Sequence, residues 1–103
     1  MIVRIWTAEA LADNAEDYRV HFTDTLVPRL RAIDGFVSAA MLERVMGEVL
    51  EFVVITRWDT MDAIHAFAGH QLERAVVGPE IRHVLERFDE TVKHYVQVAE
   101  VRA

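Results

Sequence analysis

Five histidines are the side chains of this sequence best suited to proton transfer, because an imidazole titrates near neutral pH. Two of them flank the apolar stripes of predicted helices, where either one can face a cavity between helices and sheet. We interpret these two, His21 and His65, as candidate catalytic proton acceptors. His94 instead alternates with valines along a predicted strand, which is typical of a hydrogen-bonded core histidine.

The remaining potential ligands do not predict a metal site. His65 and His70 are five residues apart, so one helical face does not present both. No His-Glu or His-Asp spacing resembles a metal-binding motif, and the chain has no cysteine. There is no glycine-rich phosphate loop, so neither flavin nor nicotinamide is indicated. We therefore predict neither a metal nor a cofactor.

Trp58 stands where an apolar run ends and a helical pattern begins. It can seal the junction between sheet and helix as a core residue, or form the wall of a pocket with its indole N–H available. We expect it to line a cavity, because open space is common where strands end beside helices. The candidate substrate-binding residues are Phe22, Thr56, Trp58 and Phe67.

Arg4 and Arg57 lie on otherwise apolar predicted strands. A buried guanidinium requires a carboxylate or a ligand anion as its partner. We interpret both as members of salt bridges across a dimer or a sheet edge, with an anionic ligand as the alternative. Tyr18 belongs to a predicted helix stripe, where its ring packs and its hydroxyl needs a partner.

Four segments rich in apolar and β-branched residues predict strands. They are Ile2–Thr7, Phe36–Val45, Val49–Trp58 and Thr91–Val101. Gly47 lies in a three-residue gap between the middle two strands, which indicates a hairpin. The third segment is apolar on both faces, so we expect both faces of that strand to be covered.

The predicted helices follow the first and third strands. Asp13 and Glu16 resemble a capping box, so the first helix should begin there, and Pro28 should kink or end it. Asp59-Thr60 should cap a second helix over Met61–Ala68. Later helical segments are expected over Leu72–Val77 and along the apolar stripe from Ile81 to Phe88.

The order β-α-β-β-α-β predicts a ferredoxin-like α+β fold, with a four-stranded antiparallel sheet and helices on one face. The 103 residues fit one domain spanning residues 1–103. The other sheet face would remain apolar and exposed, which predicts a partner. Two copies packed sheet to sheet would cover it, so we expect a homodimer.

The charge balance argues against some other partners. A net charge of −6 disfavours nucleic acid, which requires a basic surface. No cluster of Lys and Arg indicates membrane binding, and no apolar stretch is long enough to span a bilayer. The first residues read as a strand and lack a signal-peptide pattern, so we expect a cytoplasmic protein.

Three segments, Met1–Trp6, Thr56–Gly69 and Phe88–Tyr95, resemble the antibiotic biosynthesis monooxygenase family, within a branch of small bacterial proteins. The resemblance implies a dimeric α+β barrel in which two ferredoxin-like sheets face each other. The family includes cofactor-free quinone-forming oxygenases, haem-degrading enzymes, modifiers of signal molecules and proteins without a known reaction.

Residues known from the family carry over only in part. The strand-end Trp of the quinone-forming members corresponds to Trp58, but their Asn and Tyr fall on Val54 and Ile64. Two polar groups that could orient a phenol or stabilise an oxyanion are therefore missing. The Asn, Trp and ligand His of the haem-degrading branch fall on Thr7, Phe67 and Val77. Valine cannot ligate iron, so we predict no haem degradation by that scheme.

The resemblance and the residues together imply a cofactor-independent monooxygenase. It would act on a small aromatic or polyketide-like compound in a pocket between sheet and helices. The alternative is a non-catalytic dimer that binds a small hydrophobic metabolite, in a binding or stress-related role. The missing Asn and Tyr favour this alternative.

Overall fold

A computed structural model describes all residues, Met1–Ala103. The strands are β1 (Ile2–Leu11), β2 (Phe36–Met46), β3 (Val49–Trp58), β4 (Arg87–Phe88) and β5 (Lys93–Val96). The helices are α1 (Ala15–His21), α2 (Val27–Arg31), α3 (Met61–Ala68) and α4 (Pro79–Arg82). A 3₁₀ turn, η1 (Ala12–Asn14), precedes α1, and a π-helical turn, η2 (Phe22–Leu26), joins α1 to α2.

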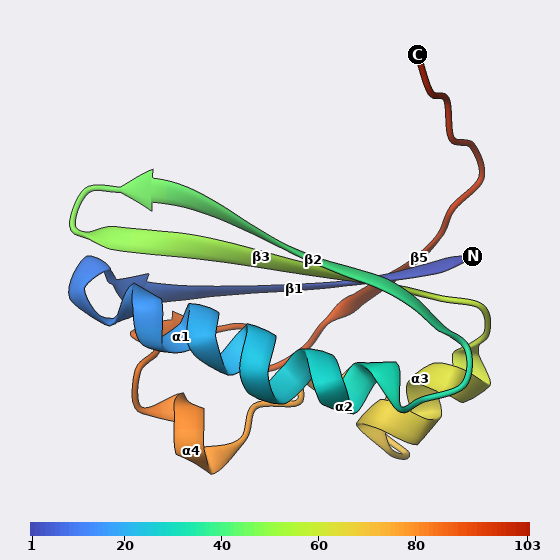
Figure 1. The fold of residues 1–103 in the computed structure, drawn as a ribbon, viewed down its shortest axis with the longest axis horizontal. Helices are drawn as coiled ribbons and strands as arrows, with labels where there is room; N and C mark the ends of the chain where they lie inside the picture. The colour runs from blue at the N-terminus through green and yellow to red at the C-terminus, as the bar shows by residue number, and fades with distance from the viewer.

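The sheet is antiparallel, with β3 between β2 and β1. Both β4 and β5 pair with the other side of β1, so these two short strands together occupy the fourth strand position. All helices lie on one side of the sheet (Figure 1). The predicted ferredoxin-like α+β fold is therefore confirmed.

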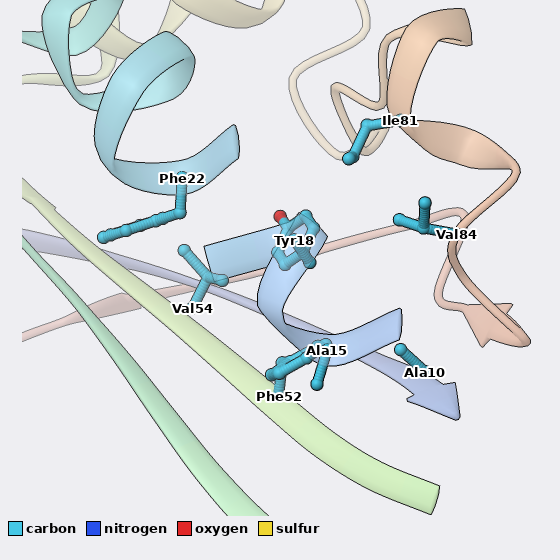
Figure 2. Packing of buried hydrophobic residues seen from close by; sticks show 8 residues of the cluster. All are labelled: Ala10, Ala15, Tyr18, Phe22, Phe52, Val54, Ile81 and Val84. Atoms are coloured by element: carbon cyan, nitrogen blue, oxygen red, sulfur yellow. The ribbon is translucent and has the colours of Figure 1, made fainter. Parts of the chain in front are cut away.

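Two clusters of buried side chains join the sheet to the helices. In the first, Tyr18 and Phe22 pack with Phe52 and Val54 of β3, while Ile81 closes the side near α4 (Figure 2). The second cluster surrounds the end of β3 and the helices next to it. Its members are Leu30, Trp58, Ala63, Ile64 and Phe67.

The start of the first helical region differs from the prediction. Neither α1 nor η1 has a side-chain cap, and α1 begins at Ala15, so the expected capping box at Asp13 does not form. Pro28 does not end the helical region, which continues to Arg31. It lies in the first turn of α2, where a missing N–H is tolerated. The expected cap of α3 does form, since the Thr60 hydroxyl accepts from the Ala63 amide.

The last third of the chain contains less regular structure than expected. The predicted helix over Leu72–Val77 is wrong, because backbone bonds join Glu73 and Ala75 to residues 90–92 instead. Helix α4 stops at Arg82 rather than following the whole apolar stripe. The last strand is shorter than predicted, since only Lys93–Val96 pair with β1, and one further bond joins the Gln97 amide to the Met1 carbonyl. The chain after β5 extends away from the helices (Figure 1).

Candidate functional site

A small cavity of ≈ 40 Å³ lies between the sheet and the helices, and four sheet residues form its floor. These are Arg4 and Trp6 of β1 with Val54 and Thr56 of β3. Side chains two residues apart share one face of a strand. The register pairs Arg4 with Thr56 and Trp6 with Val54, so all four point to the helix side.

The rest of the cavity wall is almost entirely apolar. Tyr18, Leu26, Leu30 and Phe67 reach it from the helical side. Leu26 belongs to the π-helical turn η2, while Phe67 belongs to α3. Val76 and Val92 complete the wall. The cavity therefore offers an apolar space with few polar groups, which is the usual composition of a small-molecule site.

Arg4 is buried and contributes the only charged side chain of the cavity wall. Its Nη1 donates to the Leu72 carbonyl at 2.6 Å, and its Nη2 donates to the Arg74 carbonyl at 2.9 Å. Burial lowers the pKa of Arg4 to about 10, and nearby Glu73 opposes this change, so Arg4 remains a cation at neutral pH. The predicted salt bridge is wrong for Arg4, because these hydrogen-bond partners are carbonyl groups.

His94 is the third partner of Arg4, with its Nε2 2.9 Å from Nη1. A guanidinium can only donate, so Nε2 accepts and the imidazole is neutral. Burial lowers the pKa of His94, and the charge of Arg4 lowers it further, while Glu73 acts in the opposite direction. His94 therefore adds no second charge beside the guanidinium.

Trp58 is fully buried and lies behind the cavity wall. Its Nε1 donates to the hydroxyl of Thr56 at 2.8 Å, and its ring packs against Phe36 and Phe67. The expectation that Trp58 lines the cavity is therefore wrong, and the core interpretation describes it better. Thr56 and Phe67, which it supports, do line the cavity.

Tyr18 also lines this cavity. Its ring packs against Phe52, with 5.2 Å between centroids. Burial alone raises its pKa, without a contribution from any hydrogen bond or charge. Every fully buried side-chain oxygen and nitrogen of the chain has a hydrogen-bond partner. The Tyr18 hydroxyl has none, so it is not fully buried and a water-sized group can reach it. Tyr18 is therefore a neutral donor that is available to a ligand.

The other predicted site residues lie outside the cavity wall. His21 is half-buried beside the ring of Tyr18, and burial lowers its pKa while Glu80 opposes the change. Phe22 belongs to the first core cluster. His65 is exposed, and its Nε2 lies 3.3 Å from Nδ1 of His70. The structure thus brings together Thr56 and Phe67 but not His21, His65, Phe22 or Trp58.

Two further absences bear on the site. No three residues of the His, Cys, Asp and Glu types gather closely enough to bind a metal ion. None of the helices has the length and apolar character needed to cross a membrane.

The sequence-based reasoning did not assign Arg4 and Trp6 to the site. Their alternation in β1 indicates that they share a face, but the residues of β3 that lie opposite depend on the register. The indole N–H of Trp6 is occupied, since it donates to the Asp89 carbonyl at 2.8 Å. Trp6 therefore contributes an aromatic surface, while Arg4 contributes charge.

Comparison with known families identifies the family of the chain. The family model described as antibiotic biosynthesis monooxygenase matches residues 1–79. The chain belongs to this family. A search of curated proteins found no match.

Solved structures share the fold at low sequence identity. A candidate antibiotic biosynthesis monooxygenase from Deinococcus radiodurans is 16% identical with a TM-score of 0.70, over 100% of this chain and 98% of that one. A dimeric ferredoxin-like protein from an uncultured marine organism is 15% identical with a TM-score of 0.66, over 97% and 98%. The haem degrader MhuD from Mycobacterium tuberculosis, with two haems bound in its active site, is 24% identical with a TM-score of 0.54, over 99% and 100%.

Proposed function

We propose that this member of the antibiotic biosynthesis monooxygenase family is a cofactor-independent monooxygenase for a small aromatic or polyketide-like compound. The observation that carries the proposal is the apolar cavity between sheet and helices, into which Arg4, Tyr18 and Thr56 bring polar groups. Aromatic and aliphatic walls suit a flat apolar ring, and the polar groups can orient its oxygens.

The proposed chemistry needs an electron-rich substrate. Loss of a proton from an activated ring carbon leaves a carbanion, which donates electrons to dioxygen directly. One oxygen atom replaces two hydrogens at that carbon, and the other leaves as water, so the substrate is the only reductant. The chain would position the ring, bind the oxygen that carries the charge and exclude water.

The size of the cavity limits how it can act. Drug-sized ligands occupy pockets of about 300–1,000 Å³, whereas this cavity measures ≈ 40 Å³. Substrate entry therefore requires the wall to widen. Val76 of the wall is the residue best placed to move, because it lies outside the helices and strands and makes no backbone hydrogen bond.

We also infer that the chain forms a homodimer through the face of the sheet that no helix covers. Ile5 of β1 pairs there with Ile55 of β3, and Val3 and Val53 lie on the same face, with Arg57 opposite Val3. Leu42 of β2 is 52% exposed. Apolar side chains gathered on an uncovered sheet face mark an interaction site. The dimeric ferredoxin-like relative supports a second copy as the partner.

A ligand-binding role without catalysis is the second candidate. Val54 and Ile64 occupy the positions of the family's Asn and Tyr, and both are buried among apolar side chains. No histidine lines the cavity. These observations favour binding alone, so the experiment must separate binding from turnover.

Oxygen uptake with anthrone as the probe, in the presence of a metal chelator, tests catalysis. We expect uptake with wild-type protein and formation of the corresponding quinone. Val76→Phe should fill the cavity and abolish both uptake and probe binding. Val20→Phe is the matched control, because Val20 is exposed on α1, and it should retain activity. Binding without oxygen uptake would support the non-catalytic role, and binding unaffected by Val76→Phe would refute the cavity as the site.

A further inference from the structure

We propose that Arg4 makes the cavity selective for ligands that carry an anionic oxygen, namely a phenolate, an enolate or a carboxylate. This inference rests on the proposed function, since it concerns the same cavity, and it specifies the class of compound that enters.

The first argument is the unbalanced charge of the cavity. Arg4 is the only charged side chain in its wall, and its three partners are two carbonyls and a neutral imidazole. Arg4 takes part in none of the ion pairs of the chain, which join exposed or half-exposed side chains. Glu73 is near enough to oppose the lowering of the Arg4 pKa, but it forms no ion pair with Arg4. A buried cation that is not ion-paired is costly, and an anionic ligand would offset that cost.

The second argument is the number of unused donors. A guanidinium carries five N–H groups, of which three are engaged by Leu72, Arg74 and His94. Nε and the second hydrogen of Nη2 make no hydrogen bond within the chain. Every fully buried side-chain nitrogen of the chain has a hydrogen-bond partner, so the unbonded Nε is not fully buried and a water-sized group can reach it. A ligand oxygen can therefore accept a charge-assisted hydrogen bond from Arg4.

The third argument is preorganisation. The two carbonyl bonds hold the guanidinium, and its Cζ lies 5.7 Å from the centre of the Phe67 ring. A donor that is already oriented in an apolar site stabilises developing negative charge without further reorganisation. Tyr18 and Thr56 belong to the same wall, and each carries a hydroxyl that a second ligand oxygen can use.

This arrangement also accounts for the missing base. No histidine lines the cavity. A phenol or enol can release its acidic proton to water before entry, and Arg4 then stabilises the anion that enters the cavity. The substrate would then be a phenol or an enolisable carbonyl compound, and its O-methylated form would be rejected.

The test compares 4-nitrophenol with 4-nitroanisole, which has the same ring but cannot ionise. The absorbance of nitrophenolate reports the ionisation state of the bound phenol. With wild-type protein we expect at least about tenfold tighter binding of nitrophenol, and a pKa of the bound phenol about 1–3 below its value in solution. Arg4→Gln should remove both effects, so that the two probes bind with similar affinity. Arg4→Lys should keep part of the preference.

Arg31→Gln is the matched control, because Arg31 is exposed on α2 and lies outside the cavity wall. Equal affinity of the wild-type protein for the two probes would overturn the inference and leave the proposed function intact. A preference that survives in Arg4→Gln would also overturn it. Failure of both probes to bind would count against the proposed function itself. The wild-type comparison decides the matter even if Arg4→Gln does not fold.

Discussion

At the scale of single residues, the polar groups of the cavity differ in how far they are already engaged. The hydroxyl of Thr56 accepts from Trp58, so it joins the cavity to the core behind it. Tyr18 has a raised pKa because of burial, and its hydroxyl is free to donate. Arg4 keeps its charge and donates hydrogen bonds to neutral carbonyl groups. Each group therefore contributes something different to a bound ligand.

Thr56→Val should destabilise the fold through Trp58. The substitution removes the acceptor of the buried indole N–H, and an unpaired buried donor costs about 1–3 kcal/mol. Thr56→Ser keeps the hydroxyl and should cost much less. Urea unfolding followed by tryptophan fluorescence measures the difference, and equal stabilities of the two variants would contradict the role assigned to this hydrogen bond.

His94 should make stability depend on pH. Burial and Arg4 lower its pKa in the folded chain below the ordinary value of 6.5. Between the lowered pKa of the folded chain and 6.5, the unfolded chain binds more protons than the folded chain. The free energy of unfolding therefore falls as the pH drops below 6.5, and the contribution of His94 to stability is complete above that pH.

Urea unfolding midpoints between about pH 5 and pH 8 measure this dependence. His94→Gln should flatten the profile, because an amide oxygen can still accept from Arg4 but does not titrate. His21 contributes a slope of the same sign, so the flattening should be partial. His83→Gln, at an exposed position, serves as the control. A profile unchanged by His94→Gln would contradict the prediction.

At the scale of elements, the close packing of the start of β2 against α3 depends on one glycine. Gly35 has a φ of +93°. It also packs closely against α3, since an added Cβ would lie 2.7 Å from Cβ of Ala63. Its carbonyl also accepts from the Asp59 amide at 2.8 Å. Gly35 therefore lets the chain entering β2 pass directly against α3, which carries Phe67 of the cavity wall.

Gly35→Ala should be more destabilising than Gly47→Ala. Both glycines have positive φ, and a left-handed alanine costs about 1–2 kcal/mol. Gly47 lies in open space, so only this backbone cost applies there. At Gly35 the contact with Ala63 should add roughly 1–3 kcal/mol through overpacking. Thermal and urea unfolding of the two variants test the order, and a smaller loss at Gly35 would contradict the packing argument.

At the scale of the whole molecule, the uncovered sheet face and the C-terminal segment are the two surfaces expected to contact a second copy. Val98 and Val101 are 91% and 94% exposed in the single chain. The segment after β5 points away from the helices (Figure 1). In the proposed dimer this segment can pack on the partner and remove apolar surface from water.

Deletion of residues 98–103 should therefore weaken dimerisation. An obligate interface buries about 2,000 Å² or more, and loss of part of it should raise the dissociation constant about tenfold for each 1.4 kcal/mol lost. Sedimentation velocity across a concentration series measures the change, with circular dichroism as the control for folding. An unchanged dimer would assign the interface to the sheet face alone, and a wild-type monomer at micromolar concentration would overturn the dimer.

The sequence by itself determined the elements that depend on local patterns. The alternation in β1, the apolar run of β3, the turn at Gly47 and the cap at Thr60 are each set within a few residues, so the ferredoxin-like order followed from them. The family resemblance likewise rested on short segments. The same local reasoning failed after α3, because residues 73–75 pair with residues 90–92 instead of forming a helix.

Only the tertiary structure decided which residues form the cavity. Arg4 finds its partner at Leu72, 68 residues later in the chain, and His94, 90 residues later. No periodicity in the sequence encodes such distances, because they result from the packing of a loop and an edge strand on β1. The burial of Trp58 and the placement of His21 outside the wall depend on the same long-range packing, so the composition of the cavity wall follows from how the sheet and helices pack together.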